Sequence, residues 1–149
     1  MAEPTDITNW RRLDGRTTTS GQPTEAQLAD IAALGVTHVV NLALHTHGQA
    51  LANEAASVTA LGMAYTHIPV EFTAPTEADF ARFCVVMAEI GEATVHVHCI
   101  ANYRVSAFFY RYRRDVLGWK DAAARADLDA IWRPEGVWAA FIARRDQPG

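Results

Sequence analysis

This chain of 149 residues contains only two cysteines, no long apolar run and no excess of positive charge. No apolar stretch approaches the roughly 20 residues that a membrane-crossing helix needs, so no membrane span is expected. The formal net charge of −4 offers no basic surface for nucleic acid, and no nucleic-acid partner is expected. Residues 1–6 lack a positive region followed by an apolar core, which argues against a signal peptide.

The two cysteines, Cys84 and Cys99, lie in different contexts. Cys84 falls within an apolar run with helical spacing, and Cys99 falls in a short loop between a strand and a helix. Both are expected to be reduced thiols, as in a cytoplasmic protein, rather than a disulfide. No pattern in the chain indicates an oligomeric state.

Strands and helices alternate along the sequence, which contains no repeats, linkers or low-complexity segments. A hairpin signal, Asp14-Gly15, is followed by apolar strand patterns at 36–44, 63–70 and 93–97. Helical patterns cover 24–34, 49–61, 76–90, 106–117, 120–132 and 135–145. We therefore predict one α/β domain over 1–149, with a central, mostly parallel sheet of about four to five strands flanked by helices. In such sheets, ligands bind at the carboxyl ends of the strands.

The stretch from His98 to Ser106 carries the chemistry. It follows a buried strand and precedes an apolar helix, so Cys99 sits at a strand-to-helix turn where unpaired N–H groups gather. That setting binds anions and favours a thiolate. Arg104, five residues further on, adds a planar fork of donors suited to phosphate oxygens. A thiolate, a nest of amides and an arginine together suit phosphoryl transfer through a cysteinyl-phosphate.

This stretch resembles the phosphate-binding loop of cysteine-dependent protein tyrosine and dual-specificity phosphatases, in which His-Cys is followed by five residues, Arg, and Ser or Thr. Here only four residues separate Cys99 from Arg104. Either the loop has lost a residue, or the arginine has moved one place earlier and Val105 occupies its former position. The second alignment keeps Ser106 in register, and also Asn102, which stands where the family has glycine and tolerates a left-handed backbone.

A second resemblance lies upstream, in a Ser-Gly-Gln-Pro turn within 19–24 and a Gly-Val…Val-Asn-Leu strand within 34–42. Both are similar to a compact bacterial branch of small phosphatase-like proteins, and the likeness spans 8–117. It implies a dual-specificity-phosphatase-like fold and hydrolysis of a phosphorylated substrate, most simply a phosphotyrosine-like ester, with no metal and no cofactor.

The resemblance also implies roles for individual residues. Cys99 would be the nucleophile, His98 would order the loop, and Ser106 would donate to the sulfur as it leaves. Glu71, the carboxylate of the loop after the 63–70 strand, would be the general acid in place of the usual aspartate. The substrate phosphate would be held by His98, Ile100, Ala101, Asn102, Tyr103, Arg104 and Val105.

Three other interpretations remain open at this stage. A rhodanese-like sulfurtransferase also places a cysteine on such a turn, some with four residues before the arginine. A non-catalytic module would bind phosphate or phosphotyrosine without releasing phosphate. A metal-dependent hydrolase could use the histidines His45, His47, His67, His96 and His98, although His96 is better explained as a core residue. Arg111, Arg113 and Arg114 are expected on a helix surface, in weak salt bridges.

Overall fold

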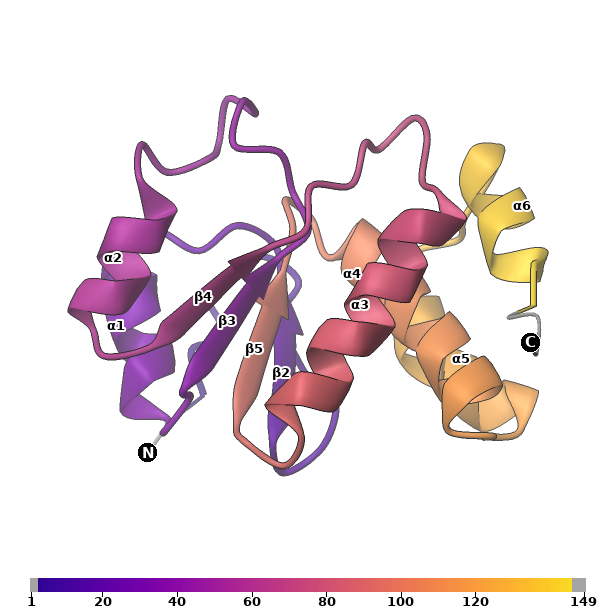
Figure 1. Ribbon diagram of the computed structural model, residues 1–149, viewed down its shortest axis with the longest axis horizontal. Helices are drawn as coiled ribbons and strands as arrows, with labels where there is room; N and C mark the ends of the chain where they lie inside the picture. The colour runs from indigo at the N-terminus through magenta and orange to yellow at the C-terminus, as the bar shows by residue number, and fades with distance from the viewer. Residues whose placement is uncertain (1–2, 146–149) are drawn as a thin grey trace.

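The computed structural model of the chain describes residues 3–145 and contains a five-stranded sheet with helices on both faces (Figure 1). The strand order is β1-β2-β5-β3-β4. β1 is antiparallel to β2, and the remaining neighbours are parallel. The strands are β1 (Arg11–Arg12), β2 (Thr17–Ser20), β3 (His38–Asn41), β4 (Ala64–His67) and β5 (Val95–His98). The predicted α/β class and mostly parallel sheet are therefore confirmed.

Two short helices cover one face of the sheet, and the longer and C-terminal helices cover the other (Figure 1). The first pair is α1 (Glu25–Ala33) and α2 (Glu54–Ala60). The second group is α3 (Glu77–Ile90), α4 (Tyr103–Arg111), its π-helical continuation η1 (Tyr112–Val116), α5 (Asp121–Ile131) and α6 (Val137–Ala143). Within 3–145, none of these helices combines the length and apolarity needed to cross a membrane.

Two helices, α2 and α4, begin at least three residues away from their predicted starts, and both changes bear on the site. α2 begins at Glu54 instead of position 49, because the Asn53 side chain accepts the Ala56 N–H and caps the helix there. α4 begins at Tyr103 instead of position 106, because Asn102 takes a left-handed conformation (φ 66°) and turns the chain directly into the helix. Arg104 therefore lies in the first turn of α4.

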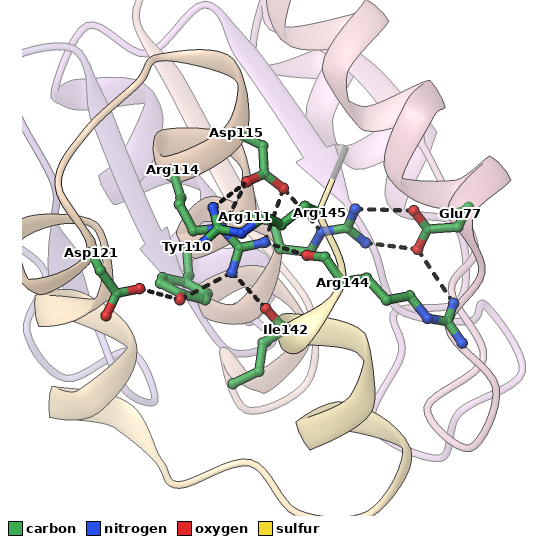
Figure 2. Close-up of polar contacts among 9 residues, drawn as sticks. All are labelled: Glu77, Tyr110, Arg111, Arg114, Asp115, Asp121, Ile142, Arg144 and Arg145. Atoms are coloured by element: carbon green, nitrogen blue, oxygen red, sulfur yellow. Dashed lines mark hydrogen bonds and ion pairs between the residues drawn. The ribbon is translucent and has the colours of Figure 1, made fainter. Parts of the chain in front are cut away.

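The expectation that Arg111, Arg113 and Arg114 lie on the surface was wrong. Their exposed fractions are 0%, 4% and 9%. A buried guanidinium needs carboxylate partners, and Arg111 has one in Glu77, which it binds through both Nη atoms at 2.7 and 3.0 Å (Figure 2). The aromatic ring of Phe80 lies 4.1 Å from the Arg111 guanidinium and covers it.

Arg114, on η1, is hydrogen-bonded to the C-terminal end of α6. Its guanidinium pairs with Asp115 at 2.7 Å and donates to the Ile142 carbonyl at 2.8 Å and to the Arg144 carbonyl (Figure 2). The last carbonyls of a helix have no partner within the helix, so one arginine both closes the end of α6 and links it to the core. This placement of α6 matters below, because α6 carries Trp138.

Candidate active site

The carboxyl ends of the four parallel strands meet at one edge of the sheet, at the top of Figure 1. A cavity of about 360 Å³ opens there. Six predicted site residues contribute to its wall, together with Leu44, Thr46, His47 and Phe72. The six are Glu71, Cys99, Ile100, Ala101, Tyr103 and Arg104. The structure thus brings the predicted nucleophile, arginine and acid to one cavity.

Three successive carbonyls of the loop after β5 are held from outside the cavity. They belong to Cys99, Ile100 and Ala101 and accept, in that order, from His98 Nδ1 at 3.0 Å, the Gln22 N–H at 3.0 Å and Asn9 Nδ2 at 2.9 Å. Since C=O and N–H point in opposite directions across a planar trans peptide, the N–H groups of Ile100 and Ala101 turn away from these donors. Fixed N–H groups beside a helix start form an anion-binding nest.

The Ser-Gly-Gln-Pro turn acquires a physical role from this contact. Gly21 packs so tightly on the loop that a Cβ there would lie 2.3 Å from the Ile100 carbonyl oxygen. Any larger residue would push the turn and the loop apart and break the neighbouring bond from the Gln22 N–H to the same oxygen. The glycine is required by close approach, not by its backbone conformation.

Asn102 ends the loop in the left-handed conformation expected of a residue in the glycine position. Its buried side-chain amide donates to the Asn9 carbonyl at 2.9 Å and to Thr19 Oγ1 at 3.0 Å. The side chain therefore locks the loop to the N-terminal segment and to β2, an anchoring that glycine could not provide.

Arg104 is nearly buried (6% exposed) and links the two loops that border the cavity. Its Nη1 donates to the Val70 carbonyl at 2.9 Å, and its Nε has no hydrogen-bond partner within residues 3–145. The following residue, Val105, is fully buried in the core. Arg104, and not Val105, therefore contributes to the cavity wall.

The loop that carries Glu71 is held on both sides of this residue. Arg104 binds the Val70 carbonyl, and the Trp138 indole N–H binds the Phe72 carbonyl at 2.6 Å. Glu71 itself is exposed and lines the cavity. Its backbone is fixed and its carboxyl group is accessible, which suits a proton donor to a bound ligand.

Ser106 is placed differently from the nucleophile's other predicted partners. Its hydroxyl donates to the Tyr103 carbonyl at 3.1 Å and accepts the Trp132 indole N–H at 3.1 Å. Among the described residues, the cavity wall includes Cys99 but not Ser106. These contacts give Ser106 a role in joining α4 to the end of α5.

Sequence reasoning missed a buried contact between a carboxyl group and the histidine that precedes Cys99. His98 Nε2 lies 2.5 Å from Glu54 Oε2, and both side chains are almost completely buried. Burial pushes the pKa of Glu54 upward, but the bonds from His98 and Gln22 and the charge of His98 outweigh this and hold the pKa below its usual value. No sequence pattern linked these residues, because Glu54 was expected within a longer helix beginning at position 49.

His96, His45 and His67 are held by contacts with neighbouring groups. His96 is fully buried and both ring nitrogens are bonded, to Thr18 Oγ1 and Ser20 Oγ at 2.8 Å each. Burial holds the pKa of His96 well below its usual value, so the ring stays neutral, as expected of a core histidine. His45 stacks on His67 with ring centroids 3.7 Å apart. Across 3–145, no three or more His, Cys, Asp or Glu side chains gather as a metal site would need.

Comparison with known proteins agrees with this geometry. Two crystal structures of a candidate phosphatase (DUF442) from Shewanella putrefaciens CN-32 superpose with TM-scores of 0.80 and 0.82 at 30% and 29% identity. They cover 92% and 93% of this chain and 88% and 91% of their own. No curated protein matches the chain.

Two more distant structures share the fold. TpbA of P. aeruginosa, crystallised with phosphotyrosine as a cysteine-to-serine variant, is 21% identical, with a TM-score of 0.68 over 87% of this chain and 76% of its own. The core catalytic domain of the PP-IP phosphatase SIW14 from S. cerevisiae is 12% identical, with a TM-score of 0.75 over 94% and 86%. The model of a family described as "DSP-PTPase phosphatase fused to NAD+ Kinase" matches residues 3–132. Because this model matches most of the chain, and because a cysteine and an arginine lie at the cavity as expected, the chain belongs to this family.

Proposed function

We propose that this protein is a phosphomonoester hydrolase that acts through a cysteinyl-phosphate. The proposal rests on one observation: Cys99 and Arg104 line the same cavity. The loop between them has its carbonyls hydrogen-bonded to other parts of the chain. The phosphate of the substrate would accept from the loop N–H groups and from the Arg104 guanidinium. Such fixed donors stabilise the charge that develops on the transferring phosphoryl group.

In the first step the Cys99 thiolate attacks phosphorus. An S–P bond forms while the P–O ester bond breaks, and its electron pair leaves on the ester oxygen. The protonated Glu71 carboxyl transfers its proton to that oxygen, and the alcohol departs. The positioned loop from Val70 to Phe72 keeps the carboxyl beside the cavity for this transfer.

In the second step water attacks the phosphoenzyme. The Glu71 carboxylate takes a proton from the water, an O–P bond forms, and the S–P bond breaks with its electrons returning to sulfur. Inorganic phosphate leaves and both groups regain their starting states. The net reaction consumes one ester and one water, and its covalent intermediate divides one difficult displacement into two easier ones.

The walls of the cavity support an aryl ester as substrate. Phe72 and Tyr103 line it, with ring centroids 6.4 Å apart, and Leu44 and Ile100 add aliphatic surface. An aromatic leaving group would pack against these side chains while its phosphate occupied the loop. A phosphotyrosine-like ester meets both requirements, and phosphotyrosine is the ligand in the TpbA complex.

The test of the function is turnover of aryl phosphate by the wild-type protein in the presence of a chelator. We expect phosphate release that EDTA does not change, because the proposed groups are all side chains and backbone amides. Inactivity toward phosphate esters, combined with a persulfide on Cys99 after thiosulfate treatment, would instead establish a sulfurtransferase. Phosphate binding without turnover would establish a binding module.

Replacing Glu71 with glutamine should slow the reaction to a degree that depends on the leaving group. General acid catalysis contributes about 10²- to 10⁴-fold, so kcat/KM for phosphotyrosine, which reports only the first chemical step, should fall by about 100-fold. p-Nitrophenyl phosphate, whose leaving group needs little protonation, should lose less than about tenfold for the same reason. Steady-state kinetics with both substrates would check this, with the exposed Glu92→Gln as control. Equal losses on both esters would argue against Glu71 as the acid.

A further inference from the structure

The Glu54–His98 pair lies outside the proposed chemistry, yet it touches the reactive loop. His98 directly precedes Cys99 and binds the Cys99 carbonyl through Nδ1 at 3.0 Å. Its other nitrogen, Nε2, binds Glu54 at 2.5 Å. The exposed fractions of the two side chains are 0% and 1%, so water cannot substitute for either contact.

The bonding pattern fixes where the protons are. A carbonyl oxygen only accepts, so His98 Nδ1 carries a hydrogen. The second oxygen of Glu54 accepts from Gln22 Nε2 at 2.9 Å, while the other hydrogen of that amide goes to the Pro23 carbonyl. Because the pKa of Glu54 is held below its usual value, its carboxyl group is ionised, and Oε2 accepts a hydrogen from His98 Nε2.

We propose that Glu54 is a positioning residue of the reactive loop, which keeps His98 as a doubly protonated imidazolium beside Cys99. The imidazolium then has two effects. Its Nδ1–H holds the Cys99 carbonyl away from the cavity, so that the Ile100 N–H faces the other way. Its positive charge next to Cys99 favours the thiolate over the thiol. The inference rests on the proposed function in taking Cys99 as the reactive group.

The surrounding titratable groups do not supply an alternative partner. His96, on the same strand, stacks beside His98 with centroids 6.3 Å apart, and is neutral with both nitrogens engaged. Tyr65 and His45, which bind each other at 2.8 Å, lie within electrostatic reach of Glu54. His67 lies within the same reach and has its pKa lowered, chiefly by burial. Glu54 is therefore the anion that pairs with His98.

The pH range of the pair follows from the carboxyl group. The pKa of Glu54 lies below its usual value of 4.5. Its contribution to stability is therefore fully present above that value and is lost only as the pH falls through the lowered pKa. Glu54 is consequently a carboxylate at both pH values at which alkylation is compared below.

The first experiment measures alkylation of Cys99 by iodoacetamide at pH 6 and at pH 9 in the wild type and in Glu54→Gln. Glutamine keeps the size of the side chain and removes its charge, and an unpaired imidazolium is too costly to bury, so His98 becomes neutral. We expect the ratio of the alkylation rate at pH 6 to that at pH 9 to be about tenfold lower in Glu54→Gln than in the wild type. A tenfold loss of thiolate at pH 6 would produce this change. Equal ratios in the wild type and a folded Glu54→Gln would overturn the proposal.

Two controls make the result specific. His98→Gln removes the cation from the other end and should lower the ratio by the same factor, and the double variant should lower it no further. Glu25→Gln removes an exposed carboxylate that binds Ser57 of α2, without contact to His98, and should alkylate like the wild type. Additive losses in the double variant would mean that Glu54 acts independently of His98.

A measurement on the unaltered protein tests the charge even if Glu54→Gln fails to fold. The ¹⁵N spectrum at neutral pH should show hydrogens on both ring nitrogens of His98, whereas a bare Nε2 would overturn the proposal. Neither this spectrum nor alkylation requires turnover. A protein with the expected spectrum and ratios but no phosphatase activity would contradict the proposed function and leave the role of Glu54 intact.

Discussion

Cys99→Ser should abolish turnover and leave phosphate binding in place. A serine hydroxyl is a far weaker nucleophile than a thiolate, so kcat should fall by roughly 10⁴-fold or more, as when other catalytic nucleophiles are removed. The loop should keep its shape, because its carbonyls are held by His98, Gln22 and Asn9 and not by the sulfur. Phosphate release and calorimetric binding of inorganic phosphate would measure both parts.

The matched control is Cys84→Ser. This thiol lies on α3, where it packs against the core away from the cavity, so the variant should retain nearly wild-type kcat with a modest loss of stability. A Cys99→Ser protein that still releases phosphate would contradict the cysteinyl-phosphate mechanism. Loss of binding together with turnover would mean that the sulfur also shapes the loop.

The fold was predictable because its local signals agree with one another. Capping boxes at Thr24 and Thr76 mark the starts of α1 and α3 in both sequence and structure. The apolar run before Cys99 becomes β5, buried along its whole length, as expected for a sheet covered on both faces. Patterns of this kind depend on neighbours a few residues away, and the chain alone contains them.

The parts that escaped prediction depend on partners far apart in the sequence. Arg111 is buried between Asp115 and Glu77, and Glu77, which binds both of its Nη atoms, lies 34 residues away in the sequence. Glu54 and Asn9 reach the reactive loop across 44 and 92 residues. Ser106 matched the family position but turned toward Trp132, since α4 starts earlier than its apolar pattern indicated. A sequence motif therefore predicts the position of the reactive cysteine, whereas the residues that contact its loop are known only from the tertiary structure.

Arg104→Ala should lower kcat/KM for an aryl phosphate by about 10²- to 10³-fold, which is the usual loss when a preorganised donor to a developing charge is removed. The side chain has two tasks, since it faces the cavity and holds the Val70 carbonyl. Arg104→Lys should recover little of the loss. The compact ammonium group of lysine cannot donate to the phosphate and to the Val70 carbonyl at the same time, as the planar guanidinium can. The exposed Arg82→Ala on α3 serves as the control for a lost cation.

The second task of Arg104 gives this variant a signature that simple loss of phosphate binding would not. Once the Val70 carbonyl is released, the loop that carries Glu71 loses one of the two bonds that flank this residue, and the carboxyl group should lose its fixed approach to the leaving oxygen. Adding Glu71→Gln to Arg104→Ala should then cost far less than it does in the wild type, because residues that act as a unit are not additive. Full additivity would show that Arg104 binds phosphate alone and that the acid loop is held in place by Trp138.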